Sequence, residues 1–158
     1  WTKDMAVKFK SVHAFEAAPD TFRCLTRNMA DNPNVSLHNA AVGEKAGHCH
    51  VKVDDQRRTN SGARYINDGG DIEIVALDDH KFGACDLLKI DVEGYEFHVI
   101  RGAMGLIKKY HPVIIMETDK RFAKIRYGID DGAAESALLN MGYDVVAHMR
   151  PDKVFVHT

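Results

Sequence analysis

Two nearly continuous apolar runs, each ending on or beside an acid, constrain the fold of this chain most strongly. Residues 86–91 read DLLKID and residues 112–118 read PVIIMET. Runs of this kind are typical of strands that are covered on both faces in a parallel sheet. Between them, Phe97, Ile100 and Ile107 recur at the spacing of one helix face. This succession of strand, helix and strand predicts an α/β domain with a mostly parallel sheet.

The alternation of strands and helices continues along the rest of the chain, with Gly, Pro and Asn between the periodic segments. A polar, glycine-bearing stretch at 54–71 is expected to be a functional or disordered loop. The last two segments, YDVVAHM and KVFVHT, predict a closing antiparallel hairpin. The other expected elements are strands at 11–16, 35–42, 48–53 and 72–77, a helix that opens at Pro19, and a helix over 133–141.

Length and composition point to one ordinary domain. The chain has 158 residues, and we expect residues 1–158 to form a single unit. Its formal net charge of −2 gives no reason to expect a nucleic-acid or membrane-surface partner. The three cysteines lack Cys-x-x-Cys spacing, which favours neither a disulfide framework nor a zinc site. No apolar stretch approaches the roughly 20 residues of a membrane span, so we expect a cytoplasmic protein.

Three expected parallel strands finish on or beside a carboxylate. Glu16 follows SVHAF, Asp91 follows LLKI and Glu117 follows VIIM. In an open α/β sheet, ligands bind outside the carboxyl ends of the strands, so these side chains should converge on one crevice. The alternative, for any one acid alone, is that it only caps the next helix or solvates a strand end.

Glu16 suggests what the crevice binds. An acid at the end of the second strand of a nucleotide-binding unit can accept both hydroxyl protons of a ribose, which fits nicotinamide cofactors and S-adenosylmethionine equally. Ala17 lies beside it in the sequence, and Asn39 and Ala40 end the next expected strand. Small residues there would leave room for an adenine ring, and Asn39 could supply hydrogen bonds.

Several segments, in their order and spacing, resemble the FkbM family of S-adenosylmethionine-dependent methyltransferases. The similarity runs through most of residues 12–118, and KIDVEGYE is its most specific part. It implies a Rossmann-like class I methyltransferase fold and methyl transfer to a hydroxyl of a sugar or natural product. The family's first strand and glycine-rich turn find no counterpart in the chain, so we expect that strand to be absent and the domain to be N-terminally incomplete. The segments that carry the resemblance are VHAFEAAP, NAAVG, IVALDD, DLLKIDVEGYEFHVIRGA and HPVIIMET.

The methyltransferase interpretation assigns roles to the acids. Asp91 would orient the acceptor, with base catalysis and cofactor contact as further roles. Glu93 would bond acceptor or cofactor, although capping of the following helix explains it equally well. Glu117 would lie on the acceptor side. We expect no metal, because His48-x-His50 lacks a third ligand.

Two other interpretations remain open. One is an NAD(P)-dependent oxidoreductase, which shares the ribose-binding acid but normally carries a Gly-x-Gly-x-x-Gly turn that this sequence lacks. The other is a truncated, non-catalytic Rossmann-like module. Strand edges left open beside an absent strand would allow pairing with a second copy. A small-molecule or glycan acceptor is the expected partner.

Overall fold

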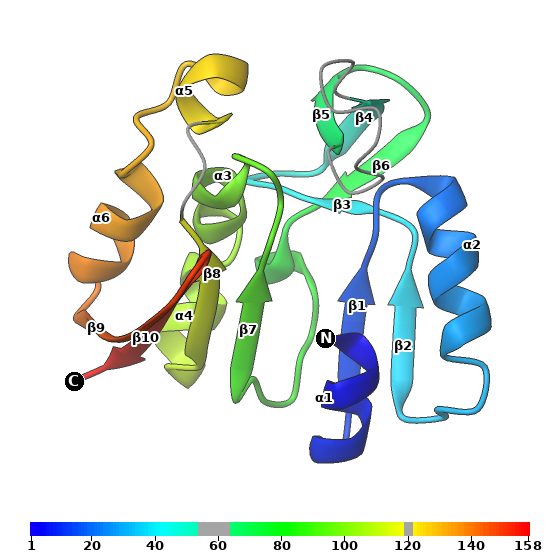
Figure 1. Ribbon diagram of the computed structural model, residues 1–158, viewed down its shortest axis with the longest axis horizontal. Coiled ribbons are helices and arrows are strands. Elements are labelled where there is room, and N and C mark those ends of the chain that lie inside the picture. Colours follow the sequence, from blue (N-terminus) through cyan, green and yellow to red (C-terminus); the bar gives the residue numbers. More distant parts are fainter. Residues whose placement is uncertain (54–63, 119–121) are drawn as a thin grey trace.

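The computed structural model of the protein describes residues 1–53, 64–118 and 122–158. Helices and short strands alternate along the chain, as the sequence predicted (Figure 1). The helices are α1 (Thr2–Lys8), α2 (Pro19–Asn28), α3 (Glu96–Arg101), α4 (Met104–Tyr110), α5 (Phe122–Tyr127) and α6 (Ala133–Leu139), with a short 3-10 helix η2 (Leu77–Asp79). The strands are β1 (Val12–Phe15), β2 (Val35–His38), β3 (Ala41–Val42), β4 (Gly47–Val53), β5 (Arg64–Asp68), β6 (Ile72–Val75), β7 (Leu87–Ile90), β8 (Val113–Glu117), β9 (Tyr143–Met149) and β10 (Asp152–His157).

The described strands form three sheets instead of the single, mostly parallel sheet that we expected. β1 and β2 pair in parallel. β7 and β8 also pair in parallel, and β10 joins β8 and β9 antiparallel, which confirms the closing hairpin. The third sheet has the order β3–β6–β4–β5 and is mixed. The expectation was wrong because the chain leaves the first sheet after β2 and builds the third sheet before it reaches β7.

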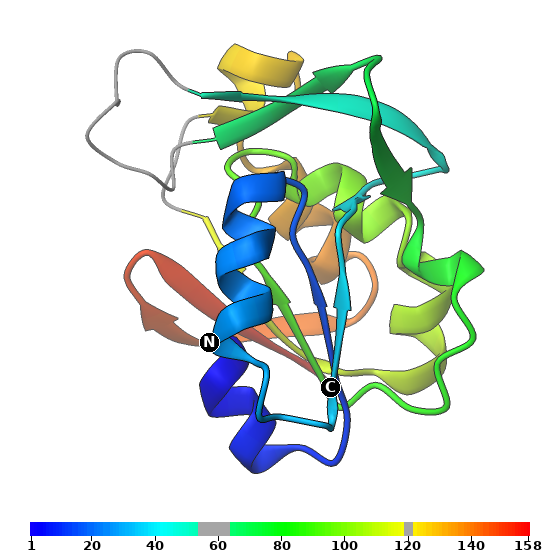
Figure 2. The ribbon, with the colours of Figure 1, turned by 90° about the vertical axis from the view of Figure 1, so that its right-hand side faces the viewer.

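β1 and β7 face each other without pairing. The two strands run in the same direction and lie side by side in both views, with α1 next to them (Figures 1 and 2). Within the described ranges, no strand pairs with the edge of β1 that faces away from β2, or with the edge of β7 that faces away from β8. Among the described residues, no sheet hydrogen-bond ladder joins the β1–β2 pair to the other two sheets.

Aromatic and histidine side chains make that connection. His80 and Phe82, which follow η2, pack on His13, Phe15 and the ring of His38. Phe15 stacks on the His38 ring with 4.4 Å between centroids, and His80 stacks on Phe82 with 5.5 Å. The segment after η2 thus covers one face of β1 and β2.

The main hydrophobic core lies between the β7–β8–β10–β9 sheet and helices α3, α4 and α6. Ile107, Ile114, Leu138 and Phe155 are 0% exposed and come from four of these elements. Burying a side chain of this size contributes about 1.5–3 kcal/mol. The apolar runs that predicted buried strands at 86–91 and 112–118 therefore supply two of the four strands of this core, β7 and β8.

The single helix expected after Asp91 is two helices, α3 and α4, which separate at Gly102. A Cβ on Gly102 would overlap the carbonyl oxygen of Gly43, so the backbone after β3 packs directly on this position. The Asp78 carboxylate then accepts the backbone N–H groups of Gly105 and Leu106, both at 2.8 Å, and caps α4. The expectation of one helix was wrong, and at the break the Gly102 carbonyl oxygen accepts the backbone N–H of the distant residue Asp78.

Two further features differ from or add to the sequence analysis. Residues 64–68 form β5, paired antiparallel with β4, although the whole of 54–71 was expected to be a loop.

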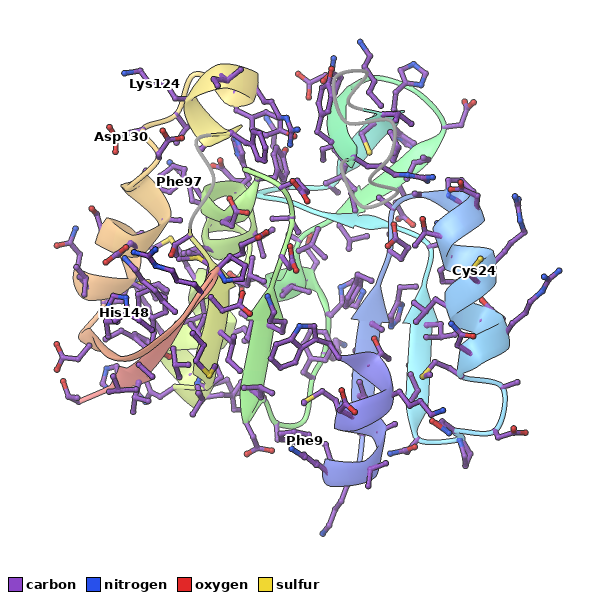
Figure 3. All side chains as sticks on the ribbon, viewed as in Figure 1. Phe9, Cys24, Phe97, Lys124, Asp130 and His148 are labelled. Atoms are coloured by element: carbon purple, nitrogen blue, oxygen red, sulfur yellow. The ribbon has the colours of Figure 1, made fainter. Side chains whose placement is uncertain are left out.

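All three cysteines are free: Cys24 is exposed on α2 (Figure 3), Cys49 is buried, and Cys85 is half-buried. Among the helices in the described ranges, none has the length and apolar character to cross a bilayer.

Candidate functional site

A pocket opens where β1 and β7 end. It has a volume of about 180 Å³, and its lining includes Phe15, Glu16, Ala17 and Asp91. Residues of the third sheet, among them Val42 and Tyr65, form its other side. Pockets that enclose a ligand of cofactor size usually have about 300–1,000 Å³, so the described residues surround only part of such a ligand. Glu16, Ala17 and Asp91, which the sequence placed at one crevice, do share this pocket.

Glu16 is held in place by its own loop. Its Oε1 accepts the backbone N–H of Ala18 at 2.7 Å. Burial raises the pKa of the Glu16 carboxyl, while the Ala18 N–H and the charge of Arg64 act in the lowering direction. One carboxylate oxygen is thus used internally, and the carboxylate lies at the pocket where hydroxyl protons can reach it.

Asn39 and Ala40 support the pocket without lining it. The Asn39 side-chain amide donates to the carbonyl oxygens of Glu16 at 2.8 Å and Ala17 at 3.2 Å. Ala40 is 5% exposed and packs where the chain passes from β2 to β3. Asn39 therefore fixes the backbone that carries Glu16. Its proposed contact with adenine stays a prediction.

Asp91, Glu93 and Glu117 form a second cluster at the ends of β7 and β8. One carboxylate oxygen from each lies within 4.8 Å of the others. Asp91 is exposed, Glu93 is half-buried, and Glu117 is only 7% exposed. Asp91 is the member that also lines the pocket. The three acids singled out in the sequence for acceptor chemistry are thus brought together. Asp91 connects this cluster to the pocket.

Local backbone geometry turns Glu93 into this cluster. Glu93 has φ +54° and Gly94 has φ +103°, both in the left-handed region. A Cβ on Gly94 would lie 2.8 Å from backbone atoms of Phe122 and Ala123, at the start of α5, so the close packing of α5 requires glycine here. A non-glycine residue in this region is uncommon, and such strain concentrates at functional sites.

Glu96, which the sequence did not single out, closes the turn before α3, and α3 has no side-chain cap. Its Oε1 accepts the backbone N–H of Gly94 at 3.0 Å. Burial raises the pKa of the Glu96 carboxyl, with the Gly94 N–H acting in the opposite direction. The signal available in the sequence was an acid in the first turn of a helix, where the helix dipole favours a carboxylate.

Two cations compensate the acid cluster. Lys89, inside the apolar strand β7, places its Nζ 3.0 Å from Asp152 and 3.6 Å from Asp91. A lysine inside an apolar strand is costly to bury unpaired, and these two carboxylates supply the partners of Lys89. Arg126 of α5 donates from Nη1 to the carbonyl oxygen of Glu93 at 2.6 Å and lies 3.8 Å from its carboxylate.

Carboxylate oxygens are the donors that hard divalent cations prefer, so Asp91, Glu93 and Glu117 have the composition of a Mg²⁺ or Ca²⁺ site. The neighbouring Lys89 and Arg126 supply positive charge to the same acids. Cations that already balance the acids lower the gain from binding a metal ion. The geometry suits recognition of polar hydroxyl groups at least as well.

The arginines of the expected loop do not share one environment. Arg57 and Arg58 lie outside the described residues. Arg64 is the first residue of β5, lines the pocket, and forms an ion pair with Asp20. Arg64 is thus a partly buried residue of the pocket wall and not a solvated loop charge. His48 and His50 are exposed on β4, and among the described residues they belong to no group of three metal-ligating side chains.

Parallel strands whose carboxyl ends carry acids beside a pocket are the arrangement of Rossmann-like α/β domains. Comparison with known proteins identifies the family within this class. The family model described as the methyltransferase FkbM domain matches residues 5–145. The chain therefore belongs to the FkbM methyltransferase family. Members of this family use S-adenosylmethionine.

A solved structure supports the fold. The crystal structure of methyltransferase FkbM from Methylobacillus flagellatus KT, at 2.20 Å resolution, superposes with a TM-score of 0.64 and 16% sequence identity. The match covers 97% of this chain and 39% of that one. At this identity the likeness shows the fold, and the chain spans about two fifths of that protein. No curated protein matches the chain.

Proposed function

We propose that the protein is an S-adenosylmethionine-dependent methyltransferase that methylates a hydroxyl group of a sugar or natural product. The observation that carries the proposal is the shared pocket of Glu16 and Asp91, from the ends of β1 and β7. Membership of the FkbM family supports the chemistry. In this proposal Glu16 binds the cofactor and Asp91 binds the acceptor.

Glu16 is the cofactor side of this proposal. A carboxylate that faces a pocket from a strand end can accept hydrogen bonds from both hydroxyls of a ribose. The apolar side chains of Phe15, Ala17 and Val42 line the same pocket and suit the flat face of an adenine ring. Asn39 fixes the backbone beneath Glu16 and so keeps its carboxylate in place.

Asp91, Glu93 and Glu117 are the acceptor side. In methyl transfer, the acceptor oxygen forms a bond to the methyl carbon while the bond from carbon to sulfur breaks, and the hydroxyl proton passes to a base or to water. The enzyme mainly aligns oxygen, carbon and sulfur. Clustered carboxylates hold hydroxyl groups by accepting their hydrogen bonds, and Asp91 can also receive the proton. A sugar or polyol carries several neighbouring hydroxyls that such a cluster can bind.

Titration calorimetry with S-adenosylhomocysteine and with NAD tests the cofactor assignment. We expect the protein to bind S-adenosylhomocysteine and to leave NAD unbound. Binding of NAD alone would move the protein to the oxidoreductases. Binding of neither ligand would favour a non-catalytic module.

The variant Asp91→Asn separates the two sides of the site. If Asp91 orients the acceptor, the substitution lowers turnover at least tenfold, equivalent to about 1.4 kcal/mol, while S-adenosylhomocysteine affinity changes much less. Asp86→Asn is the control, because Asp86 is an exposed acid just before β7, at the opposite end of the same strand. Equal loss of turnover and cofactor affinity would place Asp91 on the cofactor side.

A further inference from the structure

An ion pair joins two elements that are far apart in the sequence. Arg64 begins β5, and Asp20 lies in the first turn of α2. The Nη1 and Nη2 atoms of Arg64 donate separately to the two carboxylate oxygens of Asp20, with 2.7 Å between Nη2 and Oδ2. Two parallel hydrogen bonds fix both side chains in one orientation. The N-terminal end of α2 points toward the third sheet, where β5 lies (Figures 1 and 2).

The pair borders the pocket of Glu16. Arg64 lines that pocket, as does Thr21, which follows Asp20. β5 belongs to the third sheet, whereas α2 follows β1 of the first sheet. The ion pair therefore ties together two walls of the pocket that no sheet hydrogen bond connects within the described residues.

The environment of the Arg64 guanidinium differs from that of an ordinary surface ion pair. The Arg64 Nε is buried and has no hydrogen-bond partner among the described residues. A buried donor without an acceptor is costly, and such groups concentrate where a ligand or an unusual function accounts for them. The Asp20 side chain is 53% exposed but that of Arg64 only 24%, so the arginine is the member committed to the pocket wall.

We propose that Arg64, clamped by Asp20, is a positioning residue of the cofactor pocket that holds β5 as the wall opposite Glu16. This rests on the proposed function, because the pocket must accept a ribose-bearing cofactor. By joining β5 to the start of α2, the clamp holds these two parts of the pocket wall together. Its contribution appears in cofactor affinity and not in the methyl-transfer step.

The pH dependence of cofactor affinity provides a second test of the role of Arg64. The charge of Arg64 lowers the pKa of the Glu16 carboxyl, and the charge of Asp20 raises it. Removing the arginine therefore favours protonated Glu16, which accepts fewer ribose hydrogen bonds as pH falls. Removing the aspartate lowers the pKa of Glu16 and so favours its carboxylate form. A purely structural role of the pair would weaken binding equally at every pH.

The test is calorimetric titration of S-adenosylhomocysteine into the wild-type protein and into Arg64→Met and Asp20→Asn, from pH 5 to pH 8. We expect affinity to fall about tenfold in both variants at pH 8. We further expect the Arg64→Met affinity to fall more steeply toward pH 5 than that of Asp20→Asn. Arg23→Met and Asp31→Asn are the controls, since both residues are exposed on or just after α2.

Three outcomes decide the proposal. Variants that bind within twofold of the wild type would overturn the clamp and leave the proposed function standing. Failure of the wild-type protein to bind would overturn the proposed function and the clamp with it. Should Arg64→Met not fold by circular dichroism, Arg64→Lys keeps the charge but loses the two-pronged geometry, and wild-type affinity in that variant would also overturn the clamp.

Discussion

Replacing Gly94 by alanine perturbs the turn between β7 and α3 that carries Glu93. Gly94 has φ +103°, and an L-residue forced into that region costs about 1–3 kcal/mol. The added Cβ would lie 2.8 Å from the backbone N of Ala123 and the backbone C of Phe122, below the 3.0 Å that real Cβ contacts keep. Because both are backbone atoms, α5 must move, at a further cost of about 1–3 kcal/mol.

We therefore expect Gly94→Ala to lower the free energy of unfolding by about 3 kcal/mol, which corresponds to a fall in Tm of about 6–12 °C for a chain of this size. Displacement of α5 also shifts Arg126, which bonds the Glu93 carbonyl, so turnover should fall as well. Thermal unfolding followed by circular dichroism measures the first effect, and a methyl-transfer assay on a responsive acceptor measures the second.

Gly128→Ala is the matched control for this prediction. Gly128 also has a positive φ, +69°, but a Cβ there would meet no atom within 4 Å. Gly128→Ala should therefore lose only the free energy of placing an alanine in this backbone conformation, about 1–2 kcal/mol. Equal falls in Tm for the two variants would refute the claim that α5 packs against Gly94.

Three further predictions concern the scaffold. Asp78→Ala removes the acceptor of two backbone N–H groups at the start of α4 and should lower stability by about 1–2 kcal/mol in urea unfolding; an unchanged midpoint would contradict the cap. Phe155→Ala should lower it by about 3–5 kcal/mol, because the side chain is 0% exposed; a loss below 1 kcal/mol would mean that the site is not core. Burial raises the pKa of the Cys85 thiol to about 11, so iodoacetamide at pH 8 should modify the exposed Cys24 first, as mass spectrometry would show; equal rates would contradict this.

The sequence predicted those parts of the site that depend on local pattern. Apolar runs located β7 and β8, and the acids that follow them, Asp91 and Glu117, do meet in the structure. Glu16 lies directly after β1 and lines the pocket, while its role there stays a prediction. These inferences succeeded because strand periodicity and the position of a strand end are encoded within a few neighbouring residues.

The features that were missed depend on contacts between distant residues. Helix periodicity runs through Gly102 without interruption, whereas in the structure Gly43 packs on Gly102 and the backbone N–H of Asp78 donates to the Gly102 carbonyl oxygen. The Asp20–Arg64 pair joins residues 44 positions apart, so no spacing rule could indicate it. The division into separate sheets likewise reflects which strands pair, and pairing is a property of the folded chain.

The central claim is that Glu16 binds the ribose of S-adenosylmethionine, and calorimetric titration of S-adenosylhomocysteine into wild-type protein and Glu16→Gln tests it most directly. Burial raises the pKa of Glu16, so wild-type affinity should increase as pH rises through that pKa and the carboxylate forms. Glu16→Gln should bind at least about tenfold more weakly at pH 8 and lose this pH dependence, whereas Glu73→Gln, an exposed control on β6, should match the wild type. Wild-type affinity in Glu16→Gln, with its pH dependence intact, would contradict the account.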